Sequence, residues 1–362
     1  MKRILLVGGG SGGHIIPHIP LVIACKRLAP DAEFLYIGSR NPLDRHIVET
    51  QYGRASLTTG FAPLQFVAIF SDKLRRYFSW RSFFTPFFIL LGFFQSLYWI
   101  SRFKPDMIFI TGGYVSLPVI LAGRLWRRPI VLQESDAAMG LANRITARFA
   151  TRVLSAFPDV YHSPKTTWVG APVRQEITKG EPQRGWELTK LAPGKPVVLV
   201  MGGSLGAQSI NDLIPQVFSW IRQDLQMVHI TGAGKVIPFF SRGYVQFPYL
   251  EEDLKDVYAI ADFIVTRAGS NALAEIALLQ KPNFVIPLPG SAQGNQQENA
   301  AYFAQAGASI VLDQAGLTAQ QLGERLLGLL RNPQKQKAMR QALGKLATPH
   351  AAEKIATILL NA

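Results

Sequence analysis

The chain has 362 residues, of which 48% are hydrophobic and 17% are charged, and it contains a single cysteine. This length indicates about two domains, the apolar content excludes a disordered chain, and one cysteine excludes an internal disulfide framework or a cysteine-based zinc cluster. The net charge is +14, and residues 1–180 carry 22 Lys and Arg against 10 Asp and Glu, whereas residues 181–362 carry 16 against 14. The basic first half predicts an anionic partner: a nucleic acid, a membrane surface or a phosphorylated substrate. A surface whose charge serves solubility is the alternative.

The sequence begins MKRILLVGGG, in which the apolar run is too short for a secretory signal, so none is expected. Short apolar segments that read as buried strands then alternate with longer helical patterns, and the series restarts near residue 197. A βαβ pattern that occurs twice predicts an α/β protein with two doubly wound parallel-sheet domains. The expected strands are 4–7, 34–37, 107–110, 130–132, 153–154, 197–200, 227–230, 263–265, 284–286 and 310–312.

Glycine and proline breaks between the two series mark the domain boundary. We expect an N-terminal domain over residues 1–163, a linker over 164–196 and a C-terminal domain over 197–348. The last stretch, residues 349–362, reads as one helix that packs back on the N-terminal domain.

The first expected strand leads into Gly8-Gly-Gly-Ser-Gly-Gly-His14, which opens a helix. Glycines let the backbone approach a ligand closely, and N–H groups at a helix start bind anions. The same glycines match the dinucleotide fingerprint, but the second strand ends Ile37-Gly-Ser-Arg40 without the usual acid. Arg40 suits a 2′-phosphate instead, so an NADP-dependent oxidoreductase is an alternative, and a tight turn without ligand is another.

His14 is a candidate general base, because a neutral imidazole is available near pH 7. The alternative is a structural histidine. His14 and His18 also have the i,i+4 spacing of metal ligands, but no third ligand is evident, so no metal site is expected.

Residues 82–101 hold no charge and include eight aromatic side chains, with basic residues on both sides. A buried crossover helix and a transmembrane span are two interpretations. We favour peripheral contact with an anionic membrane, in which aromatic rings enter the acyl boundary and Lys and Arg meet headgroups. The expected membrane contacts are Arg75, Arg76, Trp80, Phe83, Phe84, Phe87, Phe88 and Trp99.

Further segments carry residues suited to bind phosphates or hydroxyl groups. Thr111-Gly-Gly-Tyr114 follows another strand and, with the first loop, predicts a phosphate or pyrophosphate site. In the second half, Gly202-Gly-Ser-Leu-Gly206 repeats the strand–glycine–helix pattern, and Glu275 lies about one turn into a helix that starts near Ser270. Glu275 suits the two hydroxyls of a ribose, although a helix-surface carboxylate is the alternative. Amide side chains over 290–299 suit sugar hydroxyls, with a solvated loop as the alternative.

Seven stretches together resemble the family 28 glycosyltransferases, in the family's order and over most of the chain. They are GGGSGGH (8–14), TGGYVSLP (111–118), ESDAAMGLANR (134–144), VGAPVR (169–174), GGSLGA (202–207), RAGSNALAEI (267–276) and NQQENA (295–300). The resemblance implies a GT-B fold, in which two Rossmann-like domains face each other across a cleft.

The implied activity is inverting transfer of N-acetylglucosamine from UDP-N-acetylglucosamine to the muramyl 4-hydroxyl of undecaprenyl-diphosphate-linked N-acetylmuramyl-pentapeptide (lipid I), which gives lipid II for peptidoglycan. The resemblance implies no cofactor, no bound metal and no nucleic-acid partner. It implies a peripheral place on the cytoplasmic face of the bacterial inner membrane, with an anionic membrane surface and other cell-wall synthesis and division proteins as partners. A GT-B transferase with a different lipid acceptor, the oxidoreductase and a non-catalytic nucleotide-sugar binder are the alternatives.

The resemblance also implies residue roles. His14 is the implied base. The implied donor-binding residues are Ser11, Gly12, Gly13, Asp136, Arg174, Ser204, Leu250, Ser270, Asn271, Ala272, Leu273, Ala274, Glu275, Gln296 and Gln297. The implied acceptor-diphosphate residues are Gly10, Ser11, Gly12, Gly13, Gly112, Gly113 and Tyr114. This chain departs from the family at Asp136 and Ala171, each of which replaces a usual Asn, and Asp136 keeps only the capacity to accept from the donor acetamide N–H.

Overall fold

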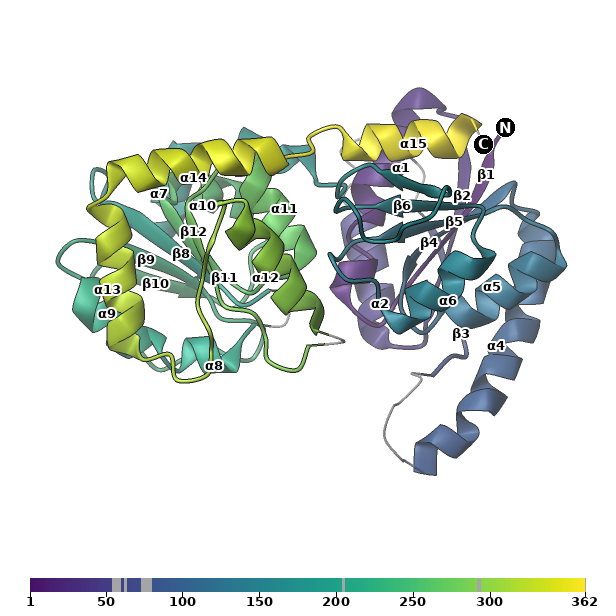
Figure 1. The fold of residues 1–362 in the computed structure, drawn as a ribbon, viewed down its shortest axis with the longest axis horizontal. Coiled ribbons are helices and arrows are strands. Elements are labelled where there is room, and N and C mark those ends of the chain that lie inside the picture. The colour runs from purple at the N-terminus through teal and green to yellow at the C-terminus, as the bar shows by residue number, and fades with distance from the viewer. Residues whose placement is uncertain (54–59, 62–63, 73–79, 204–205, 292–293, 362) are drawn as a thin grey trace. The chain divides into compact units, whose positions relative to one another are not determined.

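The structure, a computed structural model, describes residues 1–53, 60–61, 64–72, 80–203, 206–291 and 294–361. The chain forms two compact α/β units. Unit 1 comprises Met1–Val173 and Thr348–Ala362, and unit 2 comprises Arg174–Ala347 (Figure 1).

Unit 1 is built on a seven-stranded parallel sheet of order β3-β2-β1-β4-β5-β6-β7. Its strands are β1 (Arg3–Gly8), β2 (Glu33–Ser39), β3 (Gln65–Ile69), β4 (Met107–Gly112), β5 (Ile130–Glu134), β6 (Arg152–Ser155) and β7 (Thr166–Trp168). Its helices are η1 (Gly12–His14), α1 (His18–Leu28), α2 (Pro42–Ile47), η2 (Val48–Tyr52), α4 (Trp80–Phe103), α5 (Ser116–Leu125), α6 (Leu141–Phe149) and α15 (Ala351–Asn361).

Alternation along β1 explains the two-sided core of unit 1. Ile4 and Leu6 pack with α1, η2 and α15 on one face, whereas Leu5 and Val7 pack with α4, α5 and α6 on the other. All four side chains are fully buried, as expected of a parallel strand that helices cover on both faces. In folds of this kind ligands bind at the carboxyl ends of the parallel strands, which is where the loop after β1 begins.

Unit 2 has a six-stranded parallel sheet of order β10-β9-β8-β11-β12-β13. Its strands are β8 (Val197–Met201), β9 (Gln226–Ile230), β10 (Tyr244–Phe247), β11 (Phe263–Thr266), β12 (Asn283–Val285) and β13 (Ile310–Val311). Its helices are η3 (Gln175–Lys179), α7 (Pro182–Thr189), α8 (Gln208–Asn211), α9 (Ile214–Ile221), α10 (Leu254–Ile260), α11 (Ser270–Leu279), α12 (Asn295–Gln305), α13 (Ala319–Leu330) and α14 (Pro333–Leu346).

The segment 164–196 is not a separate linker, which corrects the expectation from sequence. Its first part supplies β7 to the sheet of unit 1, and the chain passes into unit 2 between Val173 and Arg174. The rest forms η3 and α7, which pack on α10 of unit 2. The chain returns to unit 1 at Thr348, and α15 lies beside α1, where Ile355 and Leu359 join the core (Figure 1).

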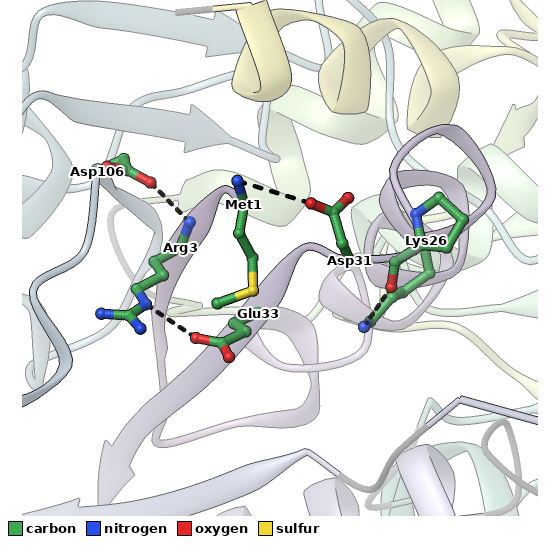
Figure 2. Close-up of polar contacts among 7 residues, drawn as sticks. Met1, Arg3, Lys26, Asp31, Glu33 and Asp106 are labelled. Atoms are coloured by element: carbon green, nitrogen blue, oxygen red, sulfur yellow. Dashed lines mark hydrogen bonds and ion pairs between the residues drawn. The ribbon is translucent and has the colours of Figure 1, made fainter.

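Surface ion pairs gather at the amino-terminal end of β1, away from the glycine loops. The backbone N–H of Arg3 donates to Asp106 at 2.7 Å, the Arg3 side chain donates to Glu33 at 2.9 Å, and the terminal amine lies 3.6 Å from Asp31 (Figure 2). Exposed pairs of this kind contribute about 0–1 kcal/mol each. Asp31 therefore serves below as a control carboxylate.

A buried histidine makes unit 2 sensitive to acid. His229 is fully buried, with Nδ1 2.9 Å from the Tyr244 hydroxyl and Nε2 3.0 Å from Asn211 Oδ1. Burial lowers the pKa of His229 to about 4, against about 6.5 for an unfolded chain. The folded state therefore keeps the ring neutral while the unfolded chain takes up a proton.

We expect the contribution of His229 to the free energy of unfolding of unit 2 to be fully present above pH 6.5. It should be lost as the pH drops from 6.5 toward 4. The loss approaches about 1.4 kcal/mol per pH unit, because the unfolded state binds one more proton in this window. Urea denaturation at several pH values measures it. His229→Gln, which keeps an amide donor and an oxygen acceptor, should flatten this dependence; an unchanged slope would contradict the assignment.

Candidate functional site

His14 lies in the loop after β1 and is fixed by Thr111 at the end of β4. Its Nδ1 is 3.1 Å from the Thr111 carbonyl oxygen, and the Thr111 hydroxyl donates to the His14 carbonyl at 2.6 Å. Because a carbonyl only accepts, Nδ1 carries the proton and Nε2 keeps its lone pair. Burial lowers the pKa of His14, while the charges of Asp136 and Asp44 and the hydrogen bond to Thr111 oppose the shift. The ring is thus neutral at pH 7 and able to accept a proton at Nε2.

The two glycine loops of unit 1 meet so closely that side chains cannot be placed there. A β-carbon on Gly113, whose φ is +88°, would collide with the carbonyl oxygen of Gly9. A β-carbon on Gly10, at φ +85°, would lie 2.6 Å from the Tyr114 ring, and one on Gly112 would lie 3.1 Å from the His14 ring. The structure therefore brings together the predicted acceptor residues Gly10, Gly112, Gly113 and Tyr114. Ser11, Gly12 and Gly13 lie in the same loop, with Gly12 buried and Gly13 exposed.

Polar residues that the sequence reasoning gave no role complete this site. Glu134 ends β5, is 3% exposed, and accepts hydrogen bonds from Asn143 Nδ2 at 2.8 Å and from the Asp136 backbone N–H at 3.0 Å. Burial, followed by the charge of Asp136, raises the pKa of Glu134 to about 7. Glu134 and Asn143 both fall in the matched stretch 134–144, and a buried acid directly after a strand is the signal that identifies them.

Glu275 of unit 2 lies among polar partners near the start of α11. Tyr258 donates to its Oε2 at 2.9 Å, and Arg174 Nη2 is 4.0 Å from its Oε1. The Glu275 side chain is 14% exposed, and burial raises its pKa against the opposing effects of Arg174 and Tyr258. A carboxylate oriented in this way can accept hydrogen bonds from neighbouring hydroxyls. The sequence did not reveal Tyr258, which is 17 residues away and fully buried.

The first turn of α11 is half-exposed at Ser270, Asn271, Ala272 and Ala274. The helix starts at Ser270 as expected, and Gly269 is its N-cap, without a side-chain hydrogen bond. One predicted donor contact needs correction here. The Leu273 side chain is fully buried in the core, so only its backbone can contact a ligand.

Other predicted donor residues are engaged or lie outside the described part. Gln296 accepts from the Leu288 N–H at 2.9 Å, and Gln297 donates to the Leu288 carbonyl at 3.1 Å, so both hold the preceding loop. Leu250 is half-buried between β10 and α10. Ser204 lies outside the described residues.

Arg267, at the carboxyl end of β11, was missed as a contributor to this region. The residue is 6% exposed, and its guanidinium donates to Gln314 Oε1 at 2.6 Å, to Ser209 Oγ at 2.7 Å and to the Ile286 carbonyl at 3.0 Å. These partners are neutral, and burial lowers the pKa of Arg267. The residue ties the end of β11 to α8 and to the loop after β13.

His14 and His18 have different partners. His18 is buried against the Tyr36 hydroxyl, at 3.2 Å from its Nδ1. Within the described ranges, no cluster of three or more His, Cys, Asp or Glu could hold a metal ion.

Helix α4 carries the uncharged stretch. It connects β3 to β4 as a crossover helix, and residues 83–103 are long and apolar enough to span a membrane by length and composition, with 22% of the most apolar window buried. Phe83, Phe84 and Phe87 are exposed, as expected of membrane contacts. Phe88 stacks on Phe70 and Trp99 packs against the core, so both are half-buried. Arg75, Arg76 and the Trp80 side chain lie outside the described residues.

The exposed face of α4 continues beyond the predicted residues. Leu90, Phe94 and Tyr98 are each more than half exposed. Beside them, a cavity of about 880 Å³ opens between α4, α5 and α6. It is lined by Thr85, Pro86, Ile89, Leu90, Phe93, Ile120, Leu121, Arg124, Leu125 and Phe149.

Comparison with known proteins identifies the class. The glycosyltransferase family 28 N-terminal domain matches residues 4–155, and the family 28 C-terminal domain matches residues 197–355. The chain therefore belongs to glycosyltransferase family 28, and it has the GT-B type of fold with two Rossmann-like domains. The predicted family and fold class are confirmed, and the oxidoreductase alternative is wrong.

Individual relatives are similar along nearly their whole length. A Geobacillus kaustophilus protein is 38% identical over 348 residues, 94% of each chain, and a Clostridium botulinum (Loch Maree) protein is 37% identical over 92% of each chain. Both are named UDP-N-acetylglucosamine–N-acetylmuramyl-(pentapeptide) pyrophosphoryl-undecaprenol N-acetylglucosamine transferase. Among solved structures, Acinetobacter baumannii MurG superposes with a TM-score of 0.76 at 23% identity over all of both chains. Neisseria meningitidis UDP-GlcNAc 2-epimerase, bound to UDP-GlcNAc, superposes at 0.71 and 13% identity, also over both whole chains.

Proposed function

We propose that this protein transfers N-acetylglucosamine from UDP-N-acetylglucosamine to the 4-hydroxyl of the muramyl residue in undecaprenyl-diphosphate-linked N-acetylmuramyl-pentapeptide. The names of relatives at 37–38% identity support the substrates. The observation that carries the chemistry is His14, whose Nδ1 is committed to the Thr111 carbonyl beside two glycine loops. This leaves Nε2 as a base on the unit that carries the predicted acceptor residues.

The reaction is a single displacement. His14 Nε2 takes the proton of the acceptor hydroxyl while its oxygen attacks the anomeric carbon of the donor sugar. The bond from that carbon to the diphosphate oxygen breaks, and UDP leaves with the electron pair from the opposite side. The configuration inverts, which gives a β-1,4 linkage.

Each unit has one task in this scheme. On unit 1, the glycine loops allow an acceptor diphosphate to reach backbone N–H groups. On unit 2, Glu275 accepts hydrogen bonds from the ribose hydroxyls of UDP, and Tyr258 and Arg174 orient its carboxylate. Asp136 of unit 1 acts on the base, because its negative charge raises the pKa of His14 against the effect of burial.

A transfer assay tests the proposal directly. Radiolabelled UDP-N-acetylglucosamine and a lipid I analogue should give a labelled product that carries one added sugar. UDP-glucose, which lacks the acetamido group, serves as the comparison donor. Absence of transfer by the wild-type protein with the analogue would overturn the proposed function.

We further propose that the protein associates with the anionic cytoplasmic face of the inner membrane through α4. Phe83, 82% exposed, with Phe84 and Phe87, supports insertion of aromatic rings. The excess of basic residues in the first half supports contact with headgroups.

Phe84→Ser with Phe87→Ser should weaken binding to vesicles that contain anionic lipid by about 10²-fold, because each buried phenylalanine contributes about 1.5–3 kcal/mol. High salt should also weaken the binding of the wild-type protein to these vesicles, since it screens the basic side chains. Vesicle flotation measures both effects. Phe240→Ser is the matched control, because Phe240 is 88% exposed on unit 2; equal losses in both variants would refute the role of α4.

A further inference from the structure

We propose that Asp44 is a positioning residue for the acceptor site, whose carboxylate holds the glycine loop after β1 and, through Ser39, the Tyr114 hydroxyl of the loop after β4. The inference rests on the proposed function, because that function makes these loops the seat of the acceptor diphosphate. Asp44 is not placed in contact with substrate.

The geometry is a junction of four chain segments. Asp44, on α2, is fully buried, and both of its carboxylate oxygens lie 3.0 Å from the Gly10 backbone nitrogen. Its Oδ2 also accepts from the Ser39 N–H at 3.1 Å and from the Ser39 hydroxyl at 2.6 Å. The Tyr114 hydroxyl in turn donates to Ser39 Oγ at 3.0 Å. One carboxylate thus links β2, α2 and both glycine loops.

The contact also accounts for a glycine that conformational freedom does not explain. A β-carbon on Gly9 would collide with Asp44 Oδ2. Gly9 is not among the positive-φ glycines. Close approach to the Asp44 carboxylate, with the Ser39 backbone nitrogen 3.2 Å from the same β-carbon position, is therefore what excludes a side chain at position 9.

The charge of Asp44 argues for a specific role in the loop. A buried carboxylate is costly unless several hydrogen bonds satisfy it, and here the donors are backbone N–H groups and a hydroxyl. The carboxylate engages the Gly10 N–H, so an incoming diphosphate must use other donors of the loop. Asp44 therefore acts as an internal anion that fixes the loop in its ligand-ready shape before the substrate arrives.

A second consequence reaches His14. The charge of Asp44 raises the pKa of His14, in opposition to burial. Loss of the charge therefore moves the pKa of His14 downward, an effect that loss of packing alone would not produce.

Asp44→Asn tests these points with little change in volume. We expect kcat/KM for the acceptor to fall by about 10²-fold, the effect of small misplacements near a reacting group, while the affinity for UDP stays unchanged. We also expect the acid limb of the pH–rate profile to move to lower pH. Asp44→Glu keeps the charge but displaces the carboxylate, so it should lower acceptor kcat/KM and leave the acid limb in place. Asp31→Asn, an exposed carboxylate on the same unit, should match the wild type (Figure 2).

A readout independent of activity separates this inference from the proposed function. Amide hydrogen exchange of the peptide 8–14 should be faster in Asp44→Asn, with β1 still protected, because the Gly10 N–H loses its acceptor. Ser39→Ala, which removes the link to Tyr114, should also speed exchange of the peptide 8–14, though by less. It provides the test if Asp44→Asn does not fold. Unchanged exchange together with a wild-type acceptor kcat/KM in a folded Asp44→Asn would overturn the inference. If the wild-type protein shows no transfer, the proposed function fails, and the exchange result alone decides the role of Asp44.

Discussion

Replacement of His14 by alanine should lower kcat by about 10²–10⁴-fold, the range of general-base catalysis. The reason is geometric: Thr111 holds Nδ1, so Nε2 is the proton acceptor for the attacking hydroxyl. Sugar transfer at saturating donor and acceptor measures the change. UDP affinity, measured by calorimetry, should remain at the wild-type value, because the residue lies on unit 1 and the ribose site lies on unit 2.

The control for this variant is His162→Ala, which removes an exposed histidine from the same unit. The pH dependence gives a second check. Because burial lowers the pKa of His14, the base form persists below pH 6.5, and wild-type turnover should decline only under more acidic conditions. Near-normal turnover of His14→Ala would remove the residue from the base role.

The sequence predicted the fold well where its signals are local. Apolar runs such as Ile4–Val7 are buried on both faces, so their composition alone marks strands. The strands that the prediction missed, β3, β7 and β10, lie at sheet edges and are partly exposed, so their sequences carry mixed polarity. The same limit applies to 164–196, where the three-residue strand β7 and two short helices looked like a linker.

The functional site divides in the same way. Glycine loops and His14 follow strands directly, so the sequence marks them. Asp44 and Tyr258 act through contacts with residues 34 and 17 positions away, and nothing in their own neighbourhoods indicates these partners. Burial decides their roles, and burial depends on tertiary packing.

Helix α4 shows a third kind of limit. Composition identified an aromatic segment but gave no orientation, since aromatic residues occur on both of its faces. The structure separates Phe88 and Trp99, which pack inward, from Phe94 and Tyr98, which are exposed. The aromatic residues predicted for membrane contact therefore include both exposed rings and half-buried rings, a difference that composition alone does not show.

Replacement of Glu275 by alanine should weaken UDP binding by about 10²-fold or more, because each hydrogen bond to a charged group contributes about 1.5–3 kcal/mol. Calorimetric titration with UDP and with 2′-deoxy-UDP measures the effect. The wild type should prefer UDP, and the variant should lose most of this preference, since the lost contact is to the ribose hydroxyls. Glu275→Gln keeps the shape beside Arg174 and guards against misfolding.

Tyr258→Phe sharpens this prediction, because it removes only the hydroxyl that donates to Glu275 at 2.9 Å. It should weaken UDP binding less than Glu275→Ala, and the two changes together should cost no more than Glu275→Ala alone, because the tyrosine acts through the carboxylate. Burial raises the pKa of Glu275, which also predicts the direction of a pH dependence. UDP affinity should fall as acidification protonates the carboxylate, and this fall should vanish in Glu275→Gln. Additive losses in the double variant, or an equal loss of affinity for UDP and 2′-deoxy-UDP, would place the carboxylate away from the ribose.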